Sequence, residues 1–431
     1  MEYTGFKKAS WIRHTNVYEV NLRQYTPEGT FNAFAKELPR LKEMGVETLW
    51  FMPVTPISQQ NMKGTMGSYY ACSDYVSINP EFGSLADFKN LVDLAHSMGF
   101  KIMIDWVANH TGWDHTWTKE NPGFYLMDEA TGTFKMASGM DDIIELDYNN
   151  PLMRKAMISA MQYWVTETGI DGFRCDLAFW VTLDFWLEAR AELERTKTLF
   201  WLAESDILEH PEYLQAFDAA YAWSWMHKTE DFYKGNGDID MLKGLLKQYS
   251  DICGNESITL WFTSNHDENS WNGTEYEKYA DMLPVLNIFS FTWNGMPMIY
   301  SGQELPNLKR LAFFDKDAIE WKGSYALEGF YKTLLNLKKE HPALVAAETA
   351  VVTHLLEAPK NIIAYQRKNG ADEVLVFLNF SEEFTVMELT DKKISGKYIN
   401  VFTGDERDLT GTVKLELPAW GYLLFKNKVS L

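Results

Sequence analysis

The sequence predicts an α/β fold: a (β/α)8 TIM barrel with a short insertion after the third strand and a C-terminal antiparallel β-sandwich. Short apolar runs alternate with amphipathic stretches as far as residue 342, which is typical of βα units around a parallel sheet. After Pro342 the pattern changes to period-two alternation with frequent turns, which indicates antiparallel strands. A chain of 431 residues is long enough for a barrel of roughly 250 residues, an insertion and a smaller domain.

Eight short apolar runs are the expected strands of the barrel. Parallel strands are covered on both faces, so they appear as nearly continuous apolar segments rather than as alternating ones. The expected strands are residues 17–22, 47–52, 101–106, 172–176, 199–204, 219–223, 258–264 and 298–301.

Amphipathic stretches between these runs supply the helices. Ser84 is an expected N-cap, and Asp87 closes a capping box at the start of a helix over residues 85–97. Pro151 opens a helix that ends before Gly169. The other expected helices cover residues 30–44, 185–195, 241–250, 276–291 and 325–340.

The pattern divides the chain into three parts. We expect the barrel to comprise residues 1–109 and 150–342, and a C-terminal β-sandwich domain to comprise residues 343–431. Residues 110–149 lack strong periodicity, and so long a connection is typical of a functional loop or a small inserted domain. The expected sandwich strands are residues 361–367, 373–379, 384–389, 398–402, 412–417 and 422–426.

Composition excludes several classes of protein. The net charge of −20 argues against nucleic acid as a partner, because phosphate binding needs basic patches. No run of 18 apolar residues exists, so we expect no membrane span, and we expect a monomer. Three cysteines give no disulfide framework, and the N-terminus lacks a signal-peptide core. Together these features favour the cytoplasm, although export with a signal already removed remains an alternative.

Three acidic residues each end an apolar run. They are Asp176, Glu204 and Asp267. In a barrel, the carboxyl ends of the strands face the side where the chemistry takes place. Three carboxylates that converge there suit the hydrolysis of a glycosidic bond. The aromatic content of 15% also suits a cleft that stacks flat sugar rings.

Five segments, taken in order, resemble the α-amylase superfamily of retaining glycoside hydrolases. They are Gly67-Ser68-Tyr69-Tyr70-Ala71-Cys72-Ser73-Asp74-Tyr75, Asp105-Trp106-Val107-Ala108-Asn109-His110, Gly172-Phe173-Arg174-Cys175-Asp176, Ala203-Glu204 and Asn265-His266-Asp267. Each is short, but their order and their positions on successive strands are specific. The resemblance runs from about Val17 to the C-terminus and implies the same three-part organisation.

The resemblance implies a role for each carboxylate. Asp176 is the expected nucleophile and Glu204 the expected general acid/base, whose pKa must be raised in the free enzyme. Asp267 matches the third carboxylate, which grips sugar hydroxyls. Arg174 lies two residues before Asp176, so on a strand it faces the same side and keeps that carboxylate ionised. Asp105 matches an aspartate that supports the arginine and the geometry of the site.

Other matches imply contacts with the sugar. His110 and His266 match histidines that hydrogen-bond the sugar in subsite −1, and Tyr70 matches the tyrosine that stacks beneath it. Many α-amylases have Lys-His where this chain has Phe179-Trp180. We therefore expect a more aromatic acceptor side, with an altered preference for chain length.

Many members of the superfamily also bind a structural calcium. Asn109 and Glu145 match two of its ligand positions, but two side chains fall well short of the roughly six to eight oxygens that calcium takes. We therefore assign no metal ligands beyond these two candidates, do not favour a structural calcium, and expect the chemistry to need no cofactor.

Three functions stay open at this point. The first is endo-acting hydrolysis of α-1,4 bonds in starch-like glucans or maltooligosaccharides through a covalent glycosyl-enzyme, which we favour. The second is an exo-acting α-glucosidase, a maltogenic enzyme or a 4-α-glucanotransferase with the same carboxylates. The third is a non-catalytic carbohydrate-binding barrel, which is disfavoured because all three carboxylates are present. Product analysis separates the first two.

Overall fold

A closed barrel of parallel strands forms the centre of the protein. The computed structural model describes residues 5–254, 257–321, 323 and 325–427. Around the barrel the strands follow the order β1-β10-β9-β8-β7-β6-β3-β2, so the predicted α/β barrel is confirmed. Its strands are β1 (Val17–Val20), β2 (Thr48–Phe51), β3 (Lys101–Trp106), β6 (Gly172–Cys175), β7 (Phe200–Asp206), β8 (Ala219–Tyr221), β9 (Ile258–Trp261) and β10 (Met296–Tyr300).

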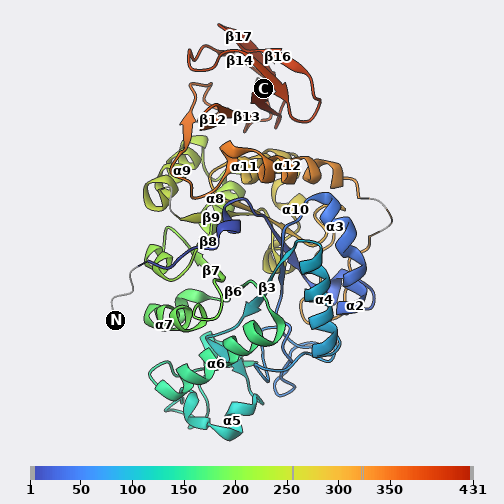
Figure 1. Ribbon diagram of the computed structural model, residues 1–431, viewed down its shortest axis with the longest axis vertical. Helices are drawn as coiled ribbons and strands as arrows, with labels where there is room; N and C mark the ends of the chain where they lie inside the picture. The colour runs from blue at the N-terminus through green and yellow to red at the C-terminus, as the bar shows by residue number, and fades with distance from the viewer. Residues whose placement is uncertain (1–4, 255–256, 322, 324, 428–431) are drawn as a thin grey trace.

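Helices surround the barrel, and their apolar faces pack on the buried strands (Figure 1). Ser84 and Asp87 form the predicted capping box at the start of α4, and Gly169 ends α6 in the left-handed conformation with φ 71°. The helices are α1 (Leu22–Tyr25), α2 (Phe31–Phe34), α3 (Leu38–Met44), α4 (Leu85–Ser97), α6 (Pro151–Thr168), α7 (Leu183–Leu193), α8 (Trp223–Tyr233), α9 (Ile239–Cys253), α10 (Glu275–Tyr279), α11 (Leu283–Thr292) and α12 (Glu328–Glu340).

Several predicted elements differ from the structure; the strands expected over 17–22 and 258–264, for instance, end at Val20 and Trp261. The helix expected over residues 276–291 is broken, because Ala280 has φ 38° and Pro284 restarts the helix in the first turn of α11. The helix expected over 30–44 contains a 3-10 turn before Pro39. The strand expected over 219–223 ends at Tyr221, and Trp223 begins α8. The aromatic residues at the start of this helix are of a type also common in strands, which explains the longer prediction.

The segment after β3 packs against the main core, to which its buried residues Phe124, Ile144 and Leu146 belong. Its strands β4 (His110–Gly112) and β5 (Ile143–Glu145) pair antiparallel, with α5 (Thr116–Glu120) between them. The rings of Trp117 and Phe124 lie 5.3 Å apart at nearly right angles. Because β4 follows β3 directly, this insertion stands beside the carboxyl ends of the barrel strands.

Two antiparallel sheets form the C-terminal part of the chain, next to α11 and α12 (Figure 1). Apolar side chains of both sheets share one core, as the predicted sandwich requires. Two short strands, β11 and β16, escaped the sequence pattern. The strands are β11 (Val351–Leu355), β12 (Ile362–Asn369), β13 (Asp372–Asn379), β14 (Thr385–Leu389), β15 (Lys397–Asn400), β16 (Glu406–Asp408), β17 (Val413–Leu417) and β18 (Tyr422–Asn427).

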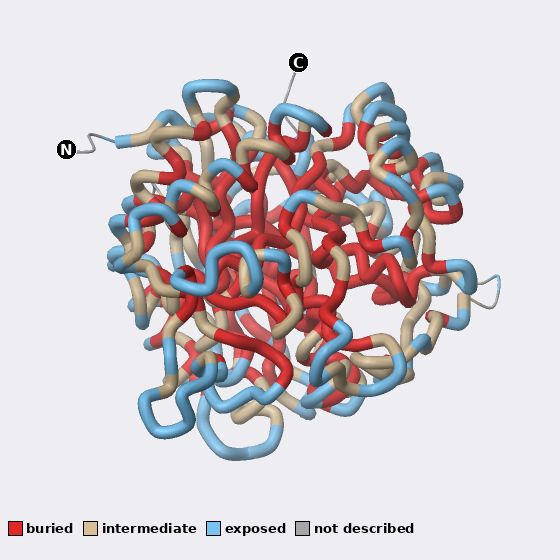
Figure 2. Tube along the Cα trace, turned by 90° about the horizontal axis from the view of Figure 1, so that it is seen from below, coloured by how far each residue is buried: buried red, intermediate tan, exposed pale blue. Residues whose placement is uncertain are grey.

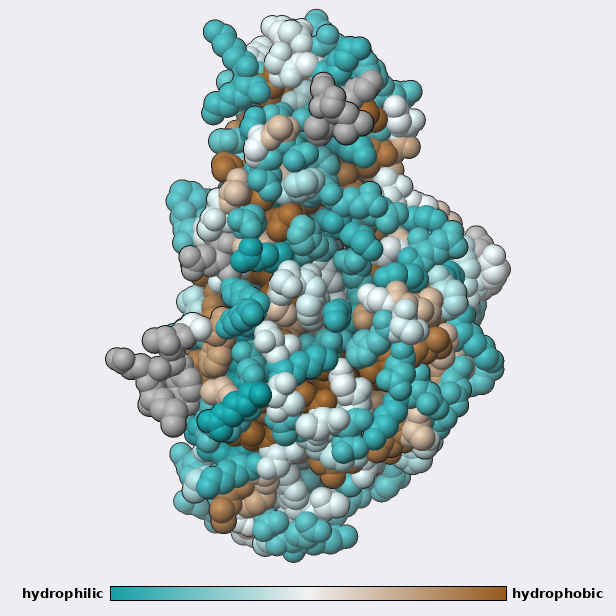
Figure 3. Space-filling model, viewed as in Figure 1, coloured by the Kyte–Doolittle hydropathy of each residue, from teal (hydrophilic) through white to brown (hydrophobic). Residues whose placement is uncertain are grey.

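Burial follows this architecture. Buried backbone fills the centre of the molecule, and exposed loops surround it (Figure 2). Hydrophilic side chains dominate the face drawn in Figure 3, in keeping with the net charge of −20. Cys72, Cys175 and Cys253 are buried free thiols. Within the described ranges, no helix is both long and apolar enough to cross a membrane.

Candidate active site

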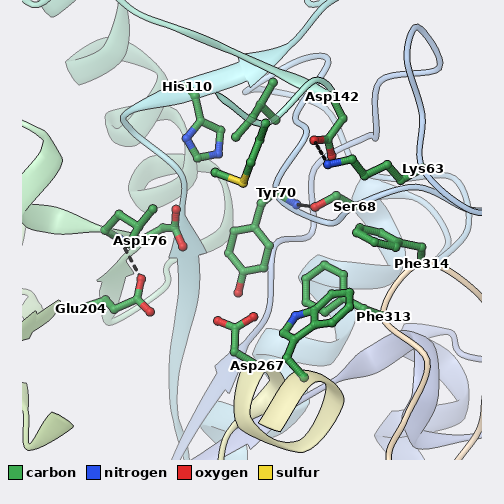
Figure 4. A pocket seen from close by; sticks show the side chains of 14 residues that line it. Lys63, Ser68, Tyr70, His110, Asp142, Asp176, Glu204, Asp267, Phe313 and Phe314 are labelled. Carbon is green, nitrogen blue, oxygen red and sulfur yellow. Dashed lines mark hydrogen bonds and ion pairs between the residues drawn. The ribbon is translucent and has the colours of Figure 1, made fainter. Parts of the chain in front are cut away.

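The carboxyl ends of β6, β7 and β9 border a cavity of about 570 Å³ (Figure 4). This is the end of a barrel at which active sites are found. The cavity is lined by Lys63, Ser68, Tyr70, His110, Met140, Asp142, Ile143, Asp176, Leu177, Glu204, Asp267, Trp271, Phe313 and Phe314. All three carboxylates that end an apolar run therefore line the same space.

One buried arginine joins three carboxylates beneath this cavity. Arg174 Nη1 donates to Asp105 Oδ1 and to Asp176 Oδ1, each at 2.9 Å. Its Nη2 forms an ion pair with Glu204 Oε1, also at 2.9 Å. The side chain of Arg174 has no exposed surface. A single guanidinium therefore contacts Asp105, Asp176 and Glu204.

Strand pairing explains why these groups meet. Asp105 on β3 is the register partner of Arg174 on β6, so the two side chains lie at the same level of the barrel. Asp176 directly follows β6, and its N–H donates to the carbonyl of Trp106 at 3.0 Å. Residues two apart on a strand face the same side, which brings Arg174 and Asp176 together as the sequence predicts.

Glu204 is the carboxyl group best suited to hold a proton. Burial is the largest cause that raises its pKa to about 7, and the negative charges of Asp176 and Asp267 add to it against the opposing charge of Arg174. The N–H of Leu177 donates to Glu204 Oε2 at 2.8 Å and orients the group. Burial also raises the pKa of Asp176, while Arg174 opposes that rise.

A chain of hydrogen bonds fixes the floor of the cavity. The hydroxyl of Tyr70 donates to Asp105 Oδ2 at 3.0 Å and lies 2.6 Å from His266 Nε2. The other ring nitrogen, Nδ1, lies 2.5 Å from Glu19 Oε1. Burial lowers the pKa of His266, but Asp267 and Glu19 raise it more, so the net pKa is well above its usual value. The imidazolium donates from both nitrogens, as these contacts require.

Asp267 is the ionised carboxylate of the cavity. Its Oδ2 lies 3.3 Å from His266 Nε2, and its side chain is 39% exposed. Burial is the largest single influence and would raise its pKa, but the charge and hydrogen bond of His266 and the charge of Arg174 together lower it. Asp267 thus offers a charged acceptor to a ligand in the cavity.

His110 and Tyr70 present two further surfaces to the cavity. Burial lowers the pKa of His110 to about 4, so its imidazole is neutral at pH 7. Its buried Nε2 has no hydrogen-bond partner among the described residues. An unpaired buried nitrogen is costly, which suits a site that a ligand completes. The ring of Tyr70 is nearly parallel to that of Phe313, with centroids 6.2 Å apart.

Two predicted substrate contacts lie apart from this group. Phe179 and Trp180 end a 3-10 turn after β6, and Phe179 stacks on His210 with ring centroids 4.7 Å apart. Neither residue is among those that line the cavity. Their rings lie 6.2 Å apart in the turn that follows Leu177.

Asn109 and Glu145, the two weak candidates for a calcium site, both have contacts within the protein. Glu145 Oε2 lies 2.6 Å from Lys135 Nζ, so a cation already neutralises it. Over the described part of the chain, no group of three His, Cys, Asp or Glu side chains is placed to hold a metal ion. The Asn109 amide instead lies 3.4 Å from His110 Nδ1.

Sequence reasoning missed several residues of the site. Glu19 was detectable, because it is an acidic residue inside the apolar strand β1. The cavity also contains Lys63, Asp142, Trp271, Phe313 and Phe314, which come from connections rather than from strand ends. Such residues carry no periodic signal, and only the folded chain brings them together.

Comparison with known proteins identifies the same family as the sequence motifs. The family model for the alpha amylase catalytic domain matches residues 13–123 and 122–321. An alpha-amylase of Haloarcula japonica is 25% identical, with 93% of this chain and 63% of the relative covered. This chain therefore spans less than two thirds of that relative. A cyclomaltodextrinase of a Bacillus species is 25% identical, over 87% of this chain and 74% of its own length.

Solved structures extend the likeness to the whole fold. A noncanonic maltogenic alpha-amylase from Thermotoga neapolitana is 28% identical, with 97% of this chain and 100% of that chain covered and a TM-score of 0.88. An alpha-amylase from Lactobacillus plantarum is 29% identical, with 97% and 99% covered and a TM-score of 0.86. With its barrel, its C-terminal sheets and a family model that matches most of its length, the chain belongs to the alpha-amylase family of glycoside hydrolases.

Proposed function

We propose that the protein hydrolyses α-1,4-glucosidic bonds of maltooligosaccharides and starch-like glucans with retention of configuration. The observation that carries this proposal is the sharing of Arg174 between Asp176 and Glu204, with 2.9 Å contacts to each. Retaining glycosidases need two carboxyl groups about 5–5.5 Å apart, and a common guanidinium supports such closeness. Glu204, whose pKa is about 7, supplies the proton that this chemistry requires.

Asp176 and Glu204 act together in the first step. Arg174 bonds Oδ1 of Asp176, which leaves Oδ2 to attack the anomeric carbon. As the bond from Oδ2 to that carbon forms, the glycosidic C–O bond breaks. Glu204 transfers its proton to the departing oxygen, so the leaving sugar departs as a neutral alcohol.

Water completes the reaction in the second step. Glu204, now ionised, removes a proton from water while the water oxygen attacks the anomeric carbon. The ester bond to Asp176 breaks, and both carboxyl groups return to their starting states. Two displacements at one carbon restore the original configuration.

The remaining groups bind and polarise the sugar. Asp267 stays ionised and accepts hydrogen bonds from sugar hydroxyls, and its charge favours the oxocarbenium-like transition state. The unpaired Nε2 of His110 is available to another hydroxyl. Tyr70, fixed by Asp105 and His266, offers its ring face to the apolar side of the sugar.

Endo action on long glucans remains the expectation from sequence, and maltogenic exo action is the second candidate. Relatives named maltogenic alpha-amylase and cyclomaltodextrinase favour the second, at 22–28% identity. An ion pair at one edge of the cavity, between Lys63 and Asp142, also favours it.

A time course of products from soluble starch and maltoheptaose tests the proposal. The protein should produce maltooligosaccharides or maltose, and D176N should produce none at equal concentration. Early mixed oligosaccharides with a fast loss of iodine staining indicate endo action, whereas one short product indicates exo action. Chains longer than the substrate would identify a transferase, and no cleavage of either substrate would contradict the proposal.

We also infer that neither the chemistry nor the fold depends on bound calcium. Lys135 already neutralises Glu145, so excess EDTA should shift the melting temperature by less than about 2 °C. A larger drop that Ca²⁺ reverses would overturn this inference.

A further inference from the structure

An ion pair at one edge of the cavity joins two segments that are distant in sequence. Lys63 Nζ lies 2.8 Å from Asp142 Oδ1 and 3.1 Å from Asp141 Oδ1. Lys63 lies in the connection after β2, and the aspartates lie in the insertion just before β5. Lys63 and Asp142 both line the cavity (Figure 4). Because Asp142 is only 6% exposed, solvent screens this pair less than a surface pair.

The backbone that carries Lys63 is fixed by a third connection. The N–H and the hydroxyl of Thr65 both donate to Asp315 Oδ1, at 2.9 and 2.6 Å. Gly64 has φ 63°, and a Cβ at this position would lie 2.5 Å from Cβ of Phe314. Only glycine permits so close an approach. Lys63 therefore projects from a braced segment rather than from a loose loop.

The position of this pair relative to Asp176 and Glu204 indicates which part of the glucan would meet it. In the proposed reaction Glu204 protonates the departing oxygen, so the departing part of the glucan extends past Glu204. The part that becomes attached to Asp176 extends the other way. In Figure 4, Asp176 and Glu204 lie on one side of Tyr70, and Lys63 and Asp142 lie on the opposite side. The pair thus borders the end of the cavity that receives the retained sugar units.

We propose that the Lys63–Asp142 pair is a stop for the non-reducing end of the glucan, so that the enzyme releases one short product from chain ends. This inference rests on the proposed function and specifies its substrate. The ammonium and carboxylate groups provide a donor and an acceptor for the terminal hydroxyls, and the rings of Phe313, Phe314 and Trp271 wall the space before them. A chain that continues beyond this point meets Lys63 and Asp142 themselves.

Two forms of maltoheptaose test the stop. One is unmodified, and the other carries a 4,6-O-ethylidene group on its non-reducing glucose, which an endo-acting enzyme tolerates. The wild-type enzyme should cleave the blocked form at least about 100-fold more slowly, because a misfit in a closed pocket costs this much in kcat/KM. Its first product from the free form should have a single size.

Matched variants assign this selectivity to the ion pair. Lys63→Ala should reduce the ratio between the two substrates at least about tenfold and broaden the sizes of the first products. Lys63→Arg keeps a cation and should keep the ratio. Lys135→Ala breaks the Lys135–Glu145 pair of the same insertion, outside the cavity lining, and should leave the ratio unchanged. Asp142→Asn removes the charge of the other member of the pair and should reduce the ratio in the same way.

The outcomes distinguish a failure of the stop from a failure of the proposed function. A wild-type enzyme that cleaves neither form contradicts the proposed function itself. Equal cleavage of both forms by the wild type overturns the stop while the proposed function stands. A folded Lys63→Ala or Asp142→Asn variant with the wild-type ratio also overturns the stop. The melting temperature of each variant identifies the folded ones, and with two independent variants the loss of one leaves the test intact.

Discussion

Asp171 and Asp176 lie at opposite ends of the same strand, β6, and both are buried. Asp171, at the amino end, has three basic partners: His96 at 2.7 Å, Lys197 at 2.9 Å and Lys101 at 3.4 Å. Burial alone would raise its pKa, but His96, Lys197 and the N–H of Ile102, which donates to Oδ2 at 3.0 Å, together lower it to about 2. At this end cations exceed carboxylates, and no proton can be held near neutral pH.

The carboxyl end of β6 has the opposite balance. There Asp105, Asp176 and Glu204 share the single cation of Arg174. Burial and mutual repulsion raise the pKa of Glu204 to about 7. Burial is thus common to both ends, and the ratio of cations to carboxylates decides whether a carboxyl group stabilises the fold or moves a proton.

The largest expected effect is the difference in kcat between D176N and D171N. Loss of the nucleophile should lower kcat at least about 10⁴-fold, a typical cost for removing such a group. D171N leaves the cavity intact and should keep kcat within about threefold of wild type. Hydrolysis of maltoheptaose measures both, with circular dichroism as the check on folding. Activity of D176N within about tenfold of wild type would break the comparison.

The role of Glu204 predicts an effect that depends on the leaving group. E204Q should lower the glycosylation rate about 10²–10⁴-fold for maltooligosaccharides, whose leaving oxygen needs a proton. Maltosyl fluoride needs no such proton, so its glycosylation rate should be close to that of wild type. Pre-steady-state kinetics on both substrates gives these rates. An equal loss for the two would rule out the acid role.

The raised pKa of Glu204 predicts the alkaline limb of the pH profile. The acid must be protonated in the free enzyme, so kcat/KM should fall about tenfold per pH unit above a pKa of about 7. Initial rates on a maltooligosaccharide between pH 5 and pH 9 measure this limb, provided that the protein stays folded throughout. A profile that is flat up to pH 9 would contradict a carboxyl group as the acid.

The smallest expected effect is on the free energy of unfolding and concerns Asp171, at the amino end of β6. Asp171 has a pKa of about 2 against a usual value of 3.8, so its charged contacts contribute about 2 kcal/mol. Because the folded pKa is lowered, this contribution is present above about pH 4 and is lost as pH falls through about 2. D171N should thus cost about 2 kcal/mol of unfolding free energy at pH 7. The difference should shrink as unfolding is measured at lower pH, and a constant difference would count against the ionic origin.

The sequence predicted what periodicity and strand ends encode. All eight barrel strands follow from apolar runs, and Asp176 and Glu204 reach the cavity from the ends of β6 and β7. Asp267 reaches it from the connection that follows β9, which ends at Trp261. A helix break that depends on one backbone angle, such as the φ of 38° at Ala280, does not change the spacing of apolar residues in the sequence. The position of a residue on a connection, such as Lys63, depends on which loops meet above the barrel. Neither periodicity nor spacing in the sequence specifies which loops meet.

Trapping the glycosyl-enzyme tests the central claim most directly. E204Q should react with maltosyl fluoride and then hydrolyse slowly, because its second step lacks a base. Mass spectrometry of the quenched protein should show the added mass of one maltosyl group, and peptide mapping should assign it to Asp176. A maltosyl group on another residue, or rapid release of product with inverted configuration and no adduct, would contradict the assignment of Asp176 as the nucleophile.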